Sequence, residues 1–200
     1  MKRSLLIITW SILMLHKLPA QLKHGVENYN VINPGNGYAW VPVIHYKGNN
    51  NFYAEARYNY EDLNTVSLYG GRCFTGGKNI SYSVTPMTGL VFGKFNGISF
   101  AANATADYRR FNFSGQLQYT INSKEKKESF FYNWSEISYQ VFEKIYSGIS
   151  VQQTMQVNTK MKTEKGLLIG YCSGKITIPV YIFSPLKNRS IITGLIFEWN

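Results

Sequence analysis

Apolar and polar residues alternate along residues 111–121, which read FNFSGQLQYTI. This two-residue period is that of a β-strand, because successive side chains point to opposite faces of a sheet. One face is apolar, and the other carries Asn, Ser, Gln and Thr without a charge. A strand on a soluble protein usually exposes Lys or Glu, whereas a confined lumen that contains water favours neutral amides and hydroxyls. The pattern therefore indicates a strand between lipid and a polar interior.

The same alternation recurs over most of the chain. Strands of roughly ten residues are separated by segments rich in Gly, Asn, Ser and Pro, which form turns. We therefore predict an all-β protein, an antiparallel up-and-down transmembrane β-barrel. The expected strands are 38–46, 51–60, 65–74, 80–93, 97–108, 111–121, 129–139, 145–157, 166–172, 175–183 and 190–199.

These eleven strands are an odd number, whereas a bacterial single-chain barrel has an even one. One more strand before Tyr38, around residues 28–32, gives twelve, which we prefer. A strand split in error gives ten. If the last strand ends in the periplasm, the long basic loops 123–128 and 158–165 lie outside the cell.

The amino terminus has the pattern of a secretory signal peptide. A basic MKR start precedes the almost wholly apolar residues 4–15, and Leu-Pro-Ala precedes Gln21. The apolar run is too short to cross a bilayer as a retained helix; a buried amino-terminal helix is the alternative. We predict a signal peptide over residues 1–20, an amino-terminal segment over 21–37 and the barrel over 38–200.

The last strand, residues 190–199, carries its apolar residues on one side and ends in an aromatic one. Ile191, Thr193, Leu195, Phe197 and Trp199 share this face. The strand resembles the terminal strand of Gram-negative outer-membrane barrels, although Asn200 makes the aromatic residue penultimate. The resemblance implies a small barrel in the cell outer membrane, in contact with its lipid and recognised by the barrel assembly machinery through this strand. It implies no specific activity.

The chain is basic, with 21 Lys and Arg against 11 Asp and Glu. Cleavage after residue 20 removes Lys2, Arg3 and Lys17, so 18 basic and 11 acidic residues leave a net charge of +7. The surplus lies in the two basic loops, and not on one face with interleaved aromatic residues, which excludes a nucleic-acid role. A weaker interpretation of the excess positive charge is attraction to anionic lipid headgroups or to surface polysaccharide.

The sequence contains two cysteines, Cys73 and Cys172. They fall on strands that lie far apart in a closed barrel, so both are expected to be free thiols. No spacing of His, Cys, Asp or Glu indicates a metal site. We expect neither a metal nor another cofactor.

The candidate site is the polar inner wall. Glu55 and Arg57 lie two residues apart on one strand and therefore share a face. Such residues can form an ion-pair network that rigidifies the barrel, a constriction that selects small polar or charged solutes, or both. The residues expected to face the lumen are Tyr53, Glu55, Arg57, Tyr69, Asp107, Gln116, Gln118, Gln152 and Glu198.

Aromatic residues make up 16% of the chain and gather near strand ends. In a membrane barrel such residues form girdles at the two lipid–water interfaces. The residues expected in the girdles are Trp40, Tyr46, Tyr58, Tyr60, Phe111, Phe130, Tyr132 and Trp199.

Three functions are compatible with this pattern. The first is an outer-membrane barrel with a structural role or a passive channel role for small solutes, without catalysis, and we prefer it. The second is an exported soluble β-barrel that binds an apolar ligand, in which the apolar faces point inward. The third is a barrel lipid hydrolase or acyltransferase, for which His45, Ser67 and Glu55 would supply the base, the nucleophile and the orienting acid. The sequence does not determine the oligomeric state.

Overall fold

The computed structural model describes residues 24–33, 37–48, 50–186 and 189–199. It contains β-strands joined by short turns, and one single-turn 3-10 helix, η1, at Lys126–Glu128. The strands are β1 His24–Asn33, β2 Gly37–Lys47, β3 Phe52–Tyr58, β4 Thr65–Arg72, β5 Phe74–Gly76, β6 Ser81–Gly93, β7 Gly97–Tyr108, β8 Phe111–Asn122, β9 Phe130–Gln140, β10 Ile145–Gln156, β11 Lys162–Ser173, β12 Ile176–Phe183 and β13 Ser190–Trp199.

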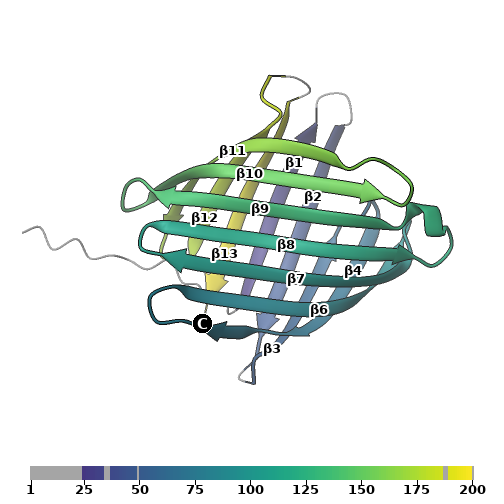
Figure 1. Ribbon diagram of the computed structural model, residues 1–200, viewed down its shortest axis with the longest axis horizontal. Helices are drawn as coiled ribbons and strands as arrows, with labels where there is room; N and C mark the ends of the chain where they lie inside the picture. Colours follow the sequence, from purple (N-terminus) through teal and green to yellow (C-terminus); the bar gives the residue numbers. More distant parts are fainter. Residues whose placement is uncertain (1–23, 34–36, 49, 187–188, 200) are drawn as a thin grey trace, which may run out of the picture.

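The strands close into a barrel (Figure 1). Consecutive strands pair antiparallel, except β4 and β5, which both pair with β6, and β1 also pairs with β13, which closes the ring. The short β5 continues β4 in the same register along β6, since Gly71 faces Met87 and Phe74 faces Val84. Because β4 and β5 occupy one position in the wall, the barrel has twelve strands, and the predicted fold and strand number are confirmed.

The additional strand predicted before Tyr38 is β1, which is longer than residues 28–32 and lies within the segment 21–37. The signal peptide predicted over residues 1–20 lies outside the described residues. The loop predicted over 158–165 is shorter, because β11 begins at Lys162 and takes its last four residues. Within the described ranges, no helix is long and apolar enough to span a membrane.

The outer wall is apolar. Ile137, Ile149, Leu167, Ile182 and Ile191 follow one another through direct strand pairing from β9 to β13. Leu167 is 56% exposed and Ile149 is 55% exposed. An apolar surface that continues from strand to strand is the outer wall of a transmembrane barrel, and a soluble barrel would have its apolar residues inside.

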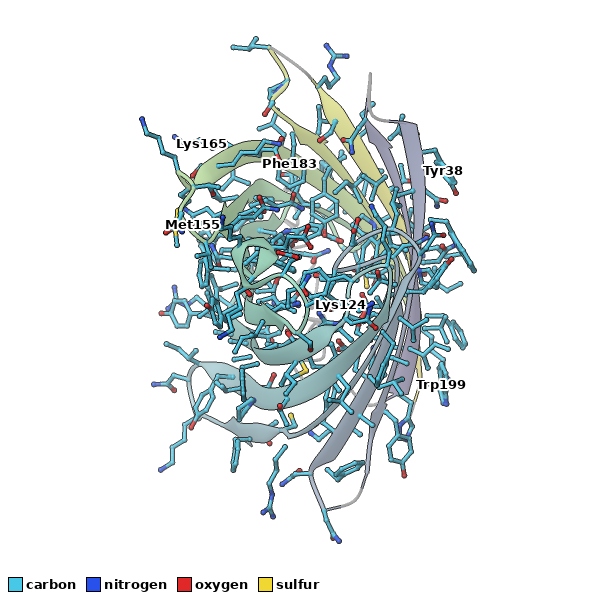
Figure 2. The ribbon with its side chains drawn as sticks, turned by 90° about the vertical axis from the view of Figure 1, so that its right-hand side faces the viewer. Tyr38, Lys124, Met155, Lys165, Phe183 and Trp199 are labelled. Carbon is cyan, nitrogen blue, oxygen red and sulfur yellow. The ribbon has the colours of Figure 1, made fainter. Side chains whose placement is uncertain are left out.

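The lumen is partly filled by side chains from the wall (Figure 2). On one side Leu168, Tyr181, Phe183 and Ile192 form an apolar cluster. On another side Tyr53, Tyr69, Met87 and Ala101 pack together. These clusters fill part of the interior of the barrel.

Glycines on the inner wall provide the space for several of these rings. The ring of Phe183, which is fully buried, lies so close to Gly166 that a Cβ there would be 2.7 Å from its Cδ1 atom. The ring is also held by Trp134 and Tyr181, at centroid distances of 6.0 and 6.1 Å. It therefore cannot move aside without disturbing the cluster.

We expect Gly166→Ala to lower the free energy of unfolding by about 1–3 kcal/mol, because the added methyl group overpacks the cluster. Urea titration of the refolded barrel measures this change. The matched control is Gly70→Ala, since no atom lies within 4 Å of a Cβ at that position. Equal stabilities of the two variants would show that the packing of the Phe183 ring does not require a glycine at position 166.

Candidate functional site

The centre of the lumen holds a buried cation between two carboxylates. Arg57 projects from β3 and pairs with Glu55 on the same strand, with side chains only 2% and 4% exposed. Its Nη1 atom is 3.6 Å from Oε1 of Glu61, whose side chain is fully buried. The guanidinium also lies over the ring of Tyr69, 4.3 Å from its centroid, which is a cation–π contact.

Glu61 belongs to the turn after β3 and folds back into the barrel. Its carboxylate accepts hydrogen bonds from the Ser67 hydroxyl at 2.7 Å and from the Tyr69 hydroxyl at 2.8 Å. It also accepts one from the Gln118 amide at 3.2 Å. The charge of Glu61 is thus satisfied by three donors as well as by Arg57.

A hydrogen bond crosses the lumen from this centre. Arg57 donates to the side-chain oxygen of Gln118 at 2.8 Å. Gln118 lies on β8, and β4, β6 and β7 separate it from β3 in the wall. The Tyr60 hydroxyl bonds to Gln116, also on β8. We name Glu55, Arg57, Glu61, Gln116 and Gln118 the arginine cluster; its contacts join β3 and the turn after it to β8 across the lumen.

A second group of charges surrounds His45 on β2. Its Nδ1 atom is 3.2 Å from a carboxylate oxygen of Glu27, and its Nε2 atom is 3.9 Å from one of Glu198. The Tyr29 hydroxyl donates to Glu27 at 2.7 Å. We name Glu27, His45 and Glu198 the histidine cluster. Tyr53 connects the two clusters, because its ring stacks on His45 and its hydroxyl donates to Glu55.

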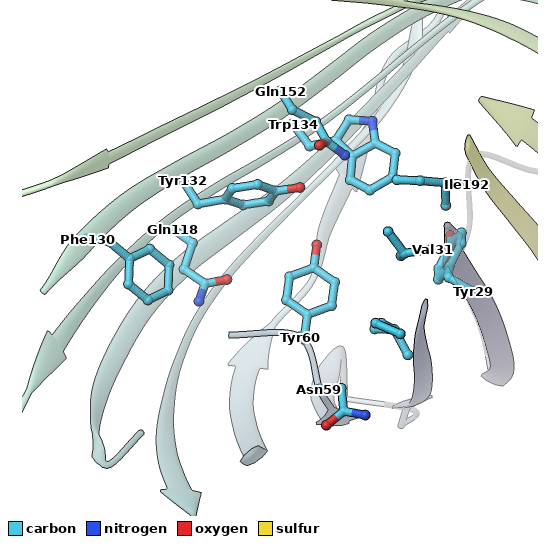
Figure 3. A pocket seen from close by; sticks show the side chains of 12 residues that line it. Tyr29, Val31, Asn59, Tyr60, Gln118, Phe130, Tyr132, Trp134, Gln152 and Ile192 are labelled. Atoms are coloured by element: carbon cyan, nitrogen blue, oxygen red, sulfur yellow. The ribbon is translucent and has the colours of Figure 1, made fainter. Parts of the chain in front are cut away.

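Aromatic rings form a cavity of about 230 Å³ beside the arginine cluster (Figure 3). The rings of Tyr60 and Tyr132 meet edge to face with centroids 6.2 Å apart. Trp134 forms another part of the wall and donates through its ring nitrogen to Ser150 at 2.8 Å. The other lining residues are Tyr29, Val31, Ala39, Val41, Asn59, Gln118, Phe130, Gln152 and Ile192.

The structure places every residue that was expected in the lumen on the inner wall. Seven of them belong to the contacts described above, and Gln152 lines the cavity. Tyr69 lies against Arg57 and Glu61. Asp107 accepts a hydrogen bond from Asn112 at 2.7 Å, near the opposite end of the barrel from η1. The role of these nine lumen residues in selecting a solute remains a prediction.

Five of the expected girdle residues lie on the outer wall. Trp40 and Tyr58 meet edge to face near one end of the barrel. Tyr46, Phe111 and Trp199 lie at the other end, and Figure 2 shows Trp199 pointing away from the barrel.

The assignment of Tyr60, Phe130 and Tyr132 to the girdle is wrong, because all three line the internal cavity. The strand that was expected to reach Tyr60 ends at Tyr58, and Asn59 has a positive φ of 56° that turns the next residues inward. Tyr132 pairs with Gln118, which faces the lumen, so Tyr132 faces it too.

Sequence reasoning missed three carboxylates of the lumen. Glu61 was assigned to an ordinary turn, and Glu27 preceded the strand expected around residues 28–32. Glu136 lies in the strand expected over residues 129–139 but was not among the residues expected in the lumen; it faces inward because β9 has no bulge at this point, where Ser114 and Ser150 pair with it directly. Its even spacing from Tyr132 and Trp134 was the available signal.

The hydrolase hypothesis requires His45 to contact Ser67. The Ser67 hydroxyl instead donates to Glu61, while His45 lies between Glu27 and Glu198. The structure does not bring the three proposed residues together. In the part of the chain that the structure describes, no group of three or more His, Cys, Asp and Glu could hold a metal, and both cysteines are free.

Two solved structures share this architecture almost from end to end. The NanC porin superposes with a TM-score of 0.67 at 12% identity, covering 87% of this chain and 100% of that chain. The KdgM porin, solved in complex with disordered oligogalacturonate, superposes with a TM-score of 0.65 at 10% identity, covering 88% and 99%. The fold is that of a small porin. No family model and no curated protein matches the chain.

The resemblance to Gram-negative outer-membrane barrels that the sequence indicated is thus confirmed for the fold. At such low identity the comparison does not transfer the solute. The function of this chain must therefore be inferred from the residues that face its lumen.

Proposed function

We propose that the protein is an outer-membrane porin through which small solutes pass passively, without catalysis. The observation that carries the proposal is the closed twelve-stranded barrel with an apolar outer wall and a polar inner wall. An apolar outer wall places a barrel in a bilayer, and a polar lumen is the water-filled path of porins. The structural likeness to two porins supports this role.

The constriction limits the proposed solutes to small ones. The hydrogen bond from Arg57 to Gln118 crosses the lumen, and the aromatic cavity beside it holds only about 230 Å³. A barrel of this size has a lumen that its own side chains can largely fill. Passage therefore takes place in the space left between these side chains.

The location and the assembly of the barrel are indicated by the two ends of the chain. The signal-peptide pattern of residues 1–20 supports export. The final strand, β13, forms the closing seam with β1 and carries the apolar-aromatic pattern through which the assembly machinery would recognise the chain.

The test uses residues 21–200 refolded into detergent. We expect unboiled protein to migrate differently from boiled protein on an SDS gel, because a folded membrane barrel resists SDS. In planar bilayers the same protein should give discrete conductance steps. A gel shift without conductance would contradict the channel and favour a structural role. A chain that stays soluble and β-rich without detergent would contradict both and favour the ligand-binding barrel.

A further inference from the structure

Carboxylates outnumber basic groups on the inner wall of the barrel. Among the described residues, the strands and the inward turn after β3 present six carboxylates to the lumen: Glu27, Glu55, Glu61, Asp107, Glu136 and Glu198. Away from the strand ends they present two basic groups, Arg57 and His45, against four carboxylates, since Asp107 and Glu198 each lie next to the last residue of a strand. The lumen is thus acidic although the whole chain has a net charge of +10.

Carboxylates outnumber basic groups within each of the two clusters as well. The single guanidinium of Arg57 faces two carboxylates, Glu55 and Glu61. His45 likewise lies between Glu27 and Glu198. Each cluster therefore keeps at least one negative charge in excess, even with His45 protonated.

Two further carboxylates have no basic partner at all among the residues with described positions. Glu136 and Asp107 take part in none of the ion pairs of the barrel. The hydrogen bond that Asp107 accepts comes from a neutral amide, that of Asn112. Glu136 lies at mid-length on β9, whereas Asp107 lies near the end of β7, so the negative charge extends along the passage.

The basic residues at the strand ends do not cancel this charge. Lys162 pairs with Glu164 at 3.3 Å, and its side chain is 73% exposed. Lys47 ends β2 and adds one positive charge at the rim. The loop 123–128 mixes lysines with Glu125 and Glu128 and is exposed, so its field is screened by salt within about 10 Å at ~0.1 M.

We infer that the lumen selects small cations over anions. This inference rests on the proposed channel function and names its substrate class. Charges on a low-dielectric wall concentrate ions of opposite sign in the passage, as rings of Asp and Glu do in cation channels. The KdgM porin was solved with an oligogalacturonate, which is a chain of carboxylates. A solute that carries such negative charges would be repelled by the acidic lumen of this chain.

The experiment is a reversal-potential measurement in planar bilayers under a steep KCl gradient at mildly alkaline pH, where the carboxylates are ionised. Cation selectivity predicts that the dilute side becomes positive at zero current. A reversal potential near zero or of the opposite sign would overturn the inference and leave the channel intact. Absence of conductance in refolded protein would overturn the channel and the inference together.

Two variants test whether the carboxylates of the lumen cause the selectivity. Glu136→Gln and Asp107→Asn each remove a carboxylate without a basic partner, and each should lower the K⁺/Cl⁻ permeability ratio roughly two- to fourfold. The matched control is Glu143→Gln in the exposed turn between β9 and β10, which should leave the ratio unchanged. The gel shift verifies that each variant folds. If both folded lumen variants keep the original ratio, the inference is wrong.

Discussion

Arg57→Ala should lower the free energy of unfolding by about 3–5 kcal/mol, the largest loss we expect from a single change in the lumen. The guanidinium is only 2% exposed and lies between Glu55 and the fully buried Glu61. Its removal leaves two neighbouring carboxylates without a cation, and each must then be desolvated alone or take up a proton. Urea titration of the refolded barrel, followed by tryptophan fluorescence, measures the loss.

Two controls separate the lost charge from the lost side chain. Arg72→Ala makes the same replacement at an exposed position at the end of β4 and should cost no more than about 0.5 kcal/mol. The triple variant Arg57→Met, Glu55→Gln and Glu61→Gln keeps most of the volume without buried charge and should recover most of the stability. A loss below ~1 kcal/mol in Arg57→Ala would show that the cluster does not stabilise the barrel.

The barrel could be predicted because its main signal is local. In a strand with one apolar face and one polar face, every second residue reports the same side, so residues 111–121 alone define both faces of β8. The same rule placed Glu55 and Arg57 together on the inner wall. Even the strand β1 could be inferred before Tyr38, since a closed barrel of this kind requires an even number of strands.

The inward positions of Glu61 and Tyr132 could not be predicted, because they depend on contacts between segments distant in the sequence. Glu61 enters the lumen because the backbone reverses at Asn59, and only then do Ser67 and Gln118 become its partners. Tyr132 faces inward because β8 and β9 pair in one particular register. Aromatic residues occupy both faces of residues 130–134, so alternation could not indicate which of them face lipid.

Leu167→Arg should lower the free energy of unfolding of the barrel in phospholipid vesicles by about 2–4 kcal/mol. Leu167 lies in the middle of β11 on the outer wall and pairs with Ile149 and Ile182 on the adjacent strands. In a membrane barrel this position faces the hydrocarbon core, where a guanidinium has neither water nor a carboxylate partner. Urea titration of vesicle-bound protein measures the change.

The same replacement distinguishes the membrane barrel from the soluble one. Leu167 is 56% exposed in the isolated chain, so a barrel dissolved in water would accept an arginine there within about 0.5 kcal/mol. Leu63→Arg, in the exposed turn between β3 and β4, is the matched control and should be neutral in either environment. Equal stability of both variants in vesicles would contradict a lipid-facing outer wall. A loss confined to Leu167→Arg can arise only if the apolar row from Ile137 to Ile191 faces lipid, because water would solvate the charge without cost.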